Sequence, residues 1–123
     1  MPWPDVQVAV VDPNPARTAQ LREVLQAWAK GEPSTSMAKG LRSANAGTAR
    51  EKASREHTQK QLATATGFTF LAADDVKDRG IELRGETIST VVFYFMPGEH
   101  DARYRFFLND KGQVADFASD SVD

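Results

Sequence analysis

Hydrophobic and polar residues alternate differently in the two halves of the chain, and the change falls near Gly67. Before it, apolar positions recur every three or four residues, which is the period of a helix face. After it, they alternate with polar positions, which is the period of a strand. Helices followed by a meander of strands predict an α+β fold. We expect N-terminal helices packed on a curved, mostly antiparallel sheet of four or five strands.

The first predicted helix spans residues 15–30. Its ends carry the appropriate residues: Asn14 suits the N-cap, Pro15 the first helical position and Gly31 the position after the last turn. Its apolar face has the spacing i, i+3, i+4, i+7 and consists of Leu21, Val24, Leu25 and Trp28. This face is predicted to lie against the sheet.

Two further helices are predicted from weaker patterns. A short one at residues 37–43 would place Met37 and Leu41 against the core. A longer one covers residues 48–66, which contain strong helix formers and neither Gly nor Pro. Its best apolar stripe is narrow and consists of Ala49, Ala53, Leu62 and Ala63. A helix with so narrow a stripe is expected to lie on the surface of the core.

Strand-like runs bounded by turn residues occupy 68–71, 76–84, 87–96, 103–108 and 113–117. The run 87–96 is apolar on both faces, so it is predicted to be central and covered on both sides. Gly80 and Gly85 are expected to curve the sheet. Residues 1–14 read as a linker-like lead-in, and 118–123 as a polar, flexible tail.

Composition limits the classes of function. With 123 residues the chain fits a single domain, 1–123, and it has no cysteine for a disulfide or thiolate metal site. The net charge is +3 over residues 1–66 and −5 over 67–123, so the acidic sheet disfavours nucleic acid. No apolar run approaches the ~20 residues of a membrane span, and the N-terminus lacks the features of a signal peptide. We expect a soluble protein and leave its compartment open.

Several segments together resemble a known family. They are Asp12–Pro15 with the helix that follows, Gly67–Leu71, Val76–Gly80, Tyr94, and Tyr104 with the stretch Asn109–Phe117. The pattern resembles the cystatin-like cone of the nuclear transport factor 2-like superfamily, in which helices close over a curved sheet. It is also similar to a module at the C-terminal end of bacterial beta-lactamase-related serine hydrolases. The Ser-x-x-Lys and Tyr-x-Asn motifs of the hydrolases themselves are absent.

The resemblance implies a non-catalytic accessory module that is associated with a serine hydrolase-like enzyme. Such a module needs no cofactor, and it would pack against a partner domain or hold a small ligand. The alternative is a free-standing isomerase or dehydratase of the same superfamily, acting on an apolar small molecule. In that class a strand carboxylate inside the cone serves as general base and a tyrosine donates to an oxyanion. Asp116 with Tyr94 or Tyr104 is the candidate set here, unless Asp116 faces solvent and pairs with Arg103 or Arg105.

An incompletely filled cone would hold a small apolar ligand between the first helix and the sheet. The residues expected to line it are Trp28, Val92, Tyr94, Tyr104 and Phe106. If the space is filled, the same residues form a solid core. Members of this superfamily dimerise through the outer face of the sheet, so the two-sided apolar strand 87–96 predicts a homodimer or a contact with a partner domain.

Two other patterns carry less weight. The stretch Val8–Pro15 before a helix resembles the start of a response-regulator receiver, in which acidic residues bind Mg²⁺. A receiver requires parallel strands alternating with helices, so Asp12 is interpreted as part of a capping turn. His57 is expected on the surface of its helix. His100 lies between two acidic residues, but the spacing matches no metal site, and no metal is predicted.

Overall fold

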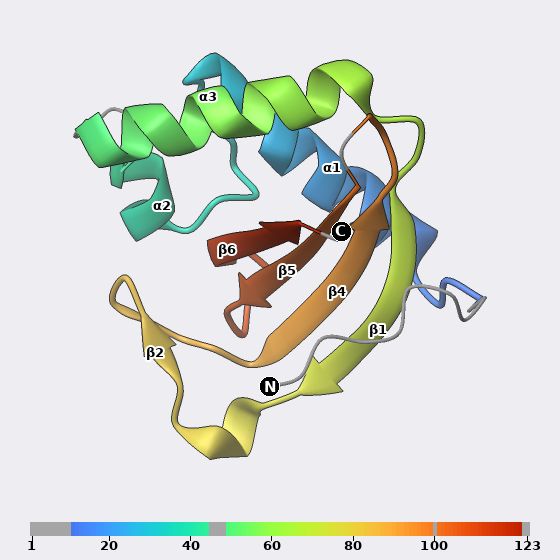
Figure 1. Cartoon of the computed structure of the whole chain (residues 1–123). Coiled ribbons are helices and arrows are strands. Elements are labelled where there is room, and N and C mark those ends of the chain that lie inside the picture. The colour runs from blue at the N-terminus through green and yellow to red at the C-terminus, as the bar shows by residue number, and fades with distance from the viewer. Residues whose placement is uncertain (1–10, 45–48, 100, 122–123) are drawn as a thin grey trace.

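The computed structural model describes residues 11–44, 49–99 and 101–121 (Figure 1). The helices are α1 (Pro15–Lys30), α2 (Lys39–Ala44) and α3 (Ala49–Thr64). The main sheet contains β1 (Thr69–Asp75), β4 (Thr90–Met96), β5 (Ala102–Leu108) and β6 (Val114–Ser121), in the order β1-β4-β5-β6. A 3₁₀ helix, η1 (Lys77–Arg79), leads to a small hairpin of β2 (Glu82–Leu83) and β3 (Glu86–Thr87). The predicted α+β fold class is therefore confirmed.

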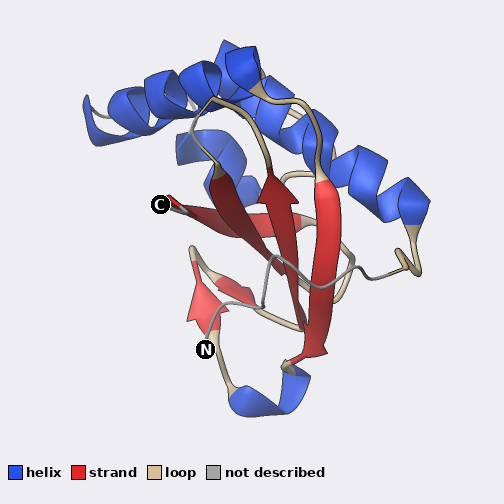
Figure 2. Ribbon diagram, turned by 45° about the vertical axis from the view of Figure 1, so that its right-hand side comes forward, coloured by secondary structure: helices blue, strands red, loops and turns tan. Residues whose placement is uncertain are grey.

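The helices lie along one side of the curved strands, as Figure 2 shows, and η1 lies at the far end of the sheet. The β2–β3 hairpin returns from that end, and its turn at Arg84 packs against Gly40 in α2. The strand pairs of both sheets are antiparallel. This topology excludes the receiver alternative. Asp12 instead belongs to the capping turn, where its carboxylate accepts from the backbone N–H of Asn14 at 2.9 Å and the hydroxyl of Thr18 at 2.5 Å.

Helix α1 follows the predicted rules at both ends. The side chain of Asn14 accepts from the backbone N–H of Arg17 at 3.1 Å, and Pro15 occupies the first turn. Gly31 closes the helix in the left-handed conformation with a φ of 71°. The predicted face is buried, namely Leu21, Val24, Leu25 and Trp28. Burial of such side chains stabilises the fold by about 1.5–3 kcal/mol each.

Strand β4 is buried on both faces, as its pattern predicts. On the helix side, Val92 and Tyr94 join the larger core cluster, and on the other side Val91 and Phe93 join a second cluster. The outer face of β4, which a partner was expected to cover, is therefore already buried within the chain at Val91 and Phe93, and only half-buried at Phe95. Among the described residues, Val11 is the one large hydrophobic residue that is exposed.

The sheet bends at bulges and not at glycines. Pairing shifts by one residue in β1 between Phe70 and Ala72, and again opposite Phe107 and Leu108, where β6 has an extra residue. Such bulges bend a strand and increase its twist. The prediction that Gly80 and Gly85 curve the sheet is wrong, because both lie in turns outside the main sheet.

Strand β6 runs further than predicted. Residues 118–121 pair with β5 up to Ser121 opposite Ala102, so the tail predicted from residue 118 is wrong for these four positions. Segment 76–84, predicted as one strand, is η1 followed by the short β2. The short helix is confirmed as α2, with Met37 and Leu41 buried.

Helix α3 turns a different face to the core than its alanines predict. Its buried residues are Thr58 and Gln61, whereas the predicted Ala49, Ala53 and Ala63 are exposed and Leu62 is half-buried. Polar contacts explain this orientation. The hydroxyl of Tyr104 donates to Gln61, and Gln59 Nε2 donates to the carbonyl of Ala29 in the last turn of α1 at 2.5 Å.

Candidate ligand-binding pocket

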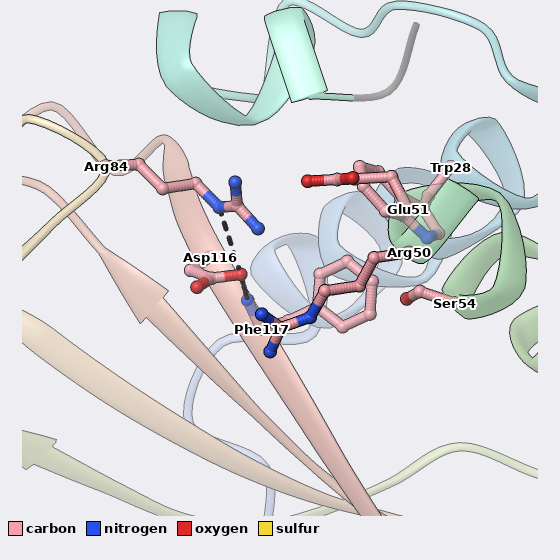
Figure 3. Close-up of a pocket in the computed structure, with 7 residues that line it drawn as sticks. All are labelled: Trp28, Arg50, Glu51, Ser54, Arg84, Asp116 and Phe117. Carbon is pink, nitrogen blue, oxygen red and sulfur yellow. Dashed lines mark hydrogen bonds and ion pairs between the residues drawn. The ribbon is translucent and has the colours of Figure 1, made fainter. Parts of the chain in front are cut away.

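A pocket of about 340 Å³ lies beside the edge strand β6 (Figure 3). Three other elements meet there: the end of α1, the first turns of α3 and the β2–β3 hairpin. The lining residues are Trp28, Arg50, Glu51, Ser54, Arg84, Asp116 and Phe117. In Figure 3, Arg84 and Asp116 lie on one side, and Trp28, Glu51 and Ser54 lie on the other.

Two aromatic rings form the apolar part of the pocket. Trp28 and Phe117 contact each other edge to face, with ring centroids 5.5 Å apart and planes at 87°. Trp28 is only 2 % exposed, and its Nε1 is buried without a hydrogen-bond partner among the described residues. An unsatisfied buried donor costs about 1–3 kcal/mol. The Trp28 ring therefore forms an apolar wall that also carries an unsatisfied N–H.

Arg84 is presented to the pocket by a strained turn. Leu83 pairs with Glu86, which leaves Arg84 and Gly85 as the two-residue loop, with φ values of 50° and 81°. Two successive positive φ values are typical of a type I′ hairpin turn, which favours Asn-Gly. Arg84 is the one non-glycine residue with a positive φ in the described ranges. A Cβ at Gly40 would lie 2.5 Å from the carbonyl oxygen of Arg84, so only glycine lets α2 pack this closely on the turn.

The guanidinium of Arg84 makes one weak contact. Its Nε lies 3.4 Å from Asp116 Oδ1, and both side chains are about one-third exposed, at 33 % and 28 %. The same carboxylate oxygen accepts from the backbone N–H of Phe117 at 2.9 Å. An ion pair this exposed contributes only about 0–1 kcal/mol.

The second arginine of the pocket is also available. Arg50 is exposed on the first turn of α3 and forms no ion pair with the described residues. Figure 3 shows its side chain extending from α3 towards β6. The lining thus combines two guanidinium groups with the carboxylates of Glu51 and Asp116.

Asp116 does not join the tyrosines. Ala115 is the extra residue of the bulge, so Asp116 pairs with Phe107 and shares its face. Simple alternation along the strand predicts that Asp116 shares the face of Val114. This prediction is wrong, because the extra residue in the bulge moves Asp116 to the opposite face. The carboxylate pairs with Arg84 and not with Arg103 or Arg105 as predicted.

The tyrosine hydroxyls are occupied by protein groups. Tyr94 shares a hydrogen bond of 2.9 Å with Thr18 Oγ1, and Tyr104 donates to Gln61. Burial raises the pKa of Tyr94, and it raises the pKa of Tyr104 to about 12. Four of the five residues predicted for a pocket are fully buried in the helix-facing core, namely Val92, Tyr94, Tyr104 and Phe106. Trp28 alone of that set lines the polar pocket beside β6.

Sequence reasoning named Asp116 as a candidate base, and it missed Arg50, Glu51, Ser54, Arg84 and Phe117 as pocket residues. Arg50, Glu51 and Ser54 read as a solvated helix face, and Phe117 as core. The turn residues Arg84-Gly85 gave the one usable signal, because a bulky arginine is unusual where a two-residue hairpin prefers Asn-Gly.

Metal and membrane chemistry gain no support in the described ranges. His57 is exposed on α3 as predicted, and His100 lies outside the described residues. The described residues contain no group of three or more His, Cys, Asp or Glu able to hold a metal ion. None of the described helices combines the length and apolar character needed to cross a bilayer.

Comparison with known proteins returned no relative. No family model matches the chain, and neither a curated protein nor a solved structure matches it. The fold class therefore rests on the structure itself. The resemblance to the nuclear transport factor 2-like superfamily, and to hydrolase-associated modules within it, stays a prediction from the sequence.

Proposed function

We propose that this protein is a non-catalytic module that binds a small molecule in the pocket beside β6. One observation carries the proposal: guanidinium and indole donors that have no protein acceptor, or only one weak contact, among the described residues converge there. The guanidinium of Arg50 has no ion-pair partner among the described residues, and Arg84 engages only its Nε. The pocket volume of about 340 Å³ is within the usual range for small-molecule sites. A ligand rich in acceptors would satisfy these donors.

Binding is favoured over catalysis because acid–base partners are not assembled. The Asp116 carboxylate is held by Arg84 and the Phe117 N–H, and it lies on the opposite face from Tyr94 and Tyr104. The isomerase or dehydratase alternative needs such a carboxylate and a tyrosine in one cavity. Asp116 does not meet either tyrosine in a shared cavity, so the described residues do not form the arrangement that this alternative requires.

An accessory role agrees with the sequence resemblance to modules that accompany serine hydrolases. In that role the bound molecule, or a partner domain, is held beside an enzyme. A partner on the outer face of the sheet would contact the half-buried Phe95 and Phe107, because Val91 and Phe93 are already covered. Self-association through that face stays a prediction.

A fragment screen by two-dimensional NMR tests the binding function. The probes are small acids, amines and neutral aromatics added to ¹⁵N-labelled protein, and a Trp3→Phe variant identifies the Trp28 indole signal. We expect at least one class to shift the indole N–H of Trp28 together with the amides of Ser54 and Phe117. The proposal is overturned if every class leaves these signals in place, or if all shifts fall on the outer face of the sheet.

A further inference from the structure

We infer that the pocket takes a small organic carboxylate, held by Arg84 and Arg50 in competition with Asp116. This inference rests on the proposed function and adds the chemical class of the ligand. It follows from four features of the site: the strain at Arg84, the unused donors of its guanidinium, the carboxylate already present, and the aromatic wall.

The strain at Arg84 points to a role for its side chain. The left-handed conformation is unfavourable for residues with a Cβ, and Asn or Gly would fit the turn better. Backbone strain of this kind concentrates at functional sites. Close packing of Gly40 on the Arg84 backbone then fixes the turn against α2. The hairpin thus maintains an unfavourable residue in a defined place.

The Arg84 guanidinium is only partly used. Arginine binds a carboxylate best through two parallel N–H groups, yet the ion pair with Asp116 is formed through Nε, at a long 3.4 Å. Figure 3 shows the two Nη atoms of Arg84 on the side of the group that faces α3, from which Arg50 extends. A second carboxylate placed there would meet the free donors of both arginines.

The site already holds a carboxylate that belongs to the chain. Asp116 Oδ1 forms an ion pair with Arg84 and accepts a hydrogen bond from the Phe117 N–H, which shows that this position accommodates the group. Because the pair is exposed and weak, an external carboxylate can share or take over Arg84. Asp116 therefore acts as a competing internal occupant.

Charge favours a monoanion with a flat apolar body. Two arginines and two acids leave the pocket lining with no net charge, so no surplus positive charge offsets the larger desolvation cost of a doubly charged ligand such as hydrogen phosphate. The rings of Trp28 and Phe117 offer an apolar wall beside the guanidinium groups. An aromatic carboxylate meets both requirements. In this structure Trp28 Nε1 is covered, so it reaches a ligand only after neighbouring side chains rotate.

The test compares three probes on the whole chain by NMR titration: benzoate, its neutral isostere benzamide, and inorganic phosphate. We expect benzoate to bind at the Trp28 signal about tenfold tighter than benzamide, because a charge-assisted contact is lost in the amide. Phosphate should bind more weakly than benzoate. Equal binding of benzamide, or tighter binding of phosphate, overturns the carboxylate assignment and leaves the binding function standing.

Two variants locate the contact. Arg84→Asn keeps a residue suited to the turn and should weaken benzoate about tenfold, whereas the matched Arg79→Asn on exposed η1 should leave it unchanged. Asp116→Asn should strengthen benzoate about fivefold, the effect of removing one like charge about 4 Å away in water. If Asp116→Asn weakens benzoate binding as Arg84→Asn does, then Asp116 positions the arginine, and the hypothesis that Asp116 competes with the ligand is wrong. If no fragment of any class shifts the pocket signals, the proposed function itself fails.

Discussion

The helix-facing core and the pocket beside β6 contain similar side chains and treat their polar atoms differently. In the core, Thr18 meets the hydroxyl of Tyr94 and Gln61 meets that of Tyr104. At the pocket, Trp28 Nε1 has no partner within the described ranges, and Arg84 makes one weak contact through Nε. In the core, the protein itself supplies the hydrogen-bond partners of the aromatic side chains, and these residues are structural. In the pocket, the protein leaves polar groups unpaired, and these groups are available to bind a ligand.

The largest expected effect is a core truncation. Phe106→Ala should reduce the free energy of unfolding by about 3–5 kcal/mol, because the fully buried ring contacts Phe68, Tyr94, Tyr104 and Phe117. Urea denaturation measures the loss. Arg50→Gln, with Lys52→Gln as its exposed neighbour on α3, should change stability by less than about 0.5 kcal/mol. A comparable loss of stability for Arg50→Gln would show that the pocket residues contribute to folding as the core residues do.

The core should also respond to alkaline pH through Tyr104. Its pKa is raised by burial to about 12, above the ordinary value of 10.0, so the unfolded chain loses this proton first. The stabilising contribution is fully present below pH 10 and disappears as the pH rises through 12, with a total of roughly 2–3 kcal/mol. Thermal unfolding across this window should show a shallower decline for Tyr104→Phe. An identical decline in both proteins would assign the alkaline loss to other groups.

Gly40→Ala tests how firmly α2 holds the Arg84 turn. Alanine normally favours a helix over glycine, yet the new Cβ would lie 2.5 Å from a backbone oxygen. We expect a net loss of about 1–3 kcal/mol and displaced amide signals at Arg84 and Gly85. Lys39→Ala, exposed in the same helix, serves as the control. Stabilisation by Gly40→Ala would mean that the turn moves freely away from α2.

The smallest effect is the most informative about the pocket. Arg84→Asn should leave stability unchanged or raise it by up to about 1 kcal/mol, because relief of the left-handed strain offsets the loss of an exposed ion pair. Arg79→Asn, which has no such strain, should be neutral. Differential scanning calorimetry distinguishes them. A clear loss for Arg84→Asn alone would make the arginine a structural residue.

The core was predictable from the sequence because periodicity marks it directly. The face of α1 and the two-sided burial of β4 follow from the local spacing of apolar residues. The polar face of α3 was not predictable, since the partner of buried Gln61 is Tyr104, which lies 43 residues away in the sequence. Long-range partners of this kind leave no local signal.

The pocket was less predictable for the same reason. Its residues come from positions 28, 50–54, 84 and 116–117, which lie on four separate elements. No spacing rule connects such positions. The bulge at Ala115 adds a second obstacle, because one unpaired residue reverses the alternation on which face assignments depend.

That bulge determines which side chains of β6 face the core and which face outward. Because Ala115 is the unpaired residue of the bulge, Phe117 faces Trp28, and Asp116 lies on the same face as Phe107. Flattening the bulge while keeping its residue would exchange the two side chains and carry a carboxylate into the aromatic interior. Deleting Ala115 would instead keep both side chains on their present faces. In the evolution of such a strand, an inserted or deleted residue that the bulge does not take up therefore has a larger chemical consequence than most substitutions.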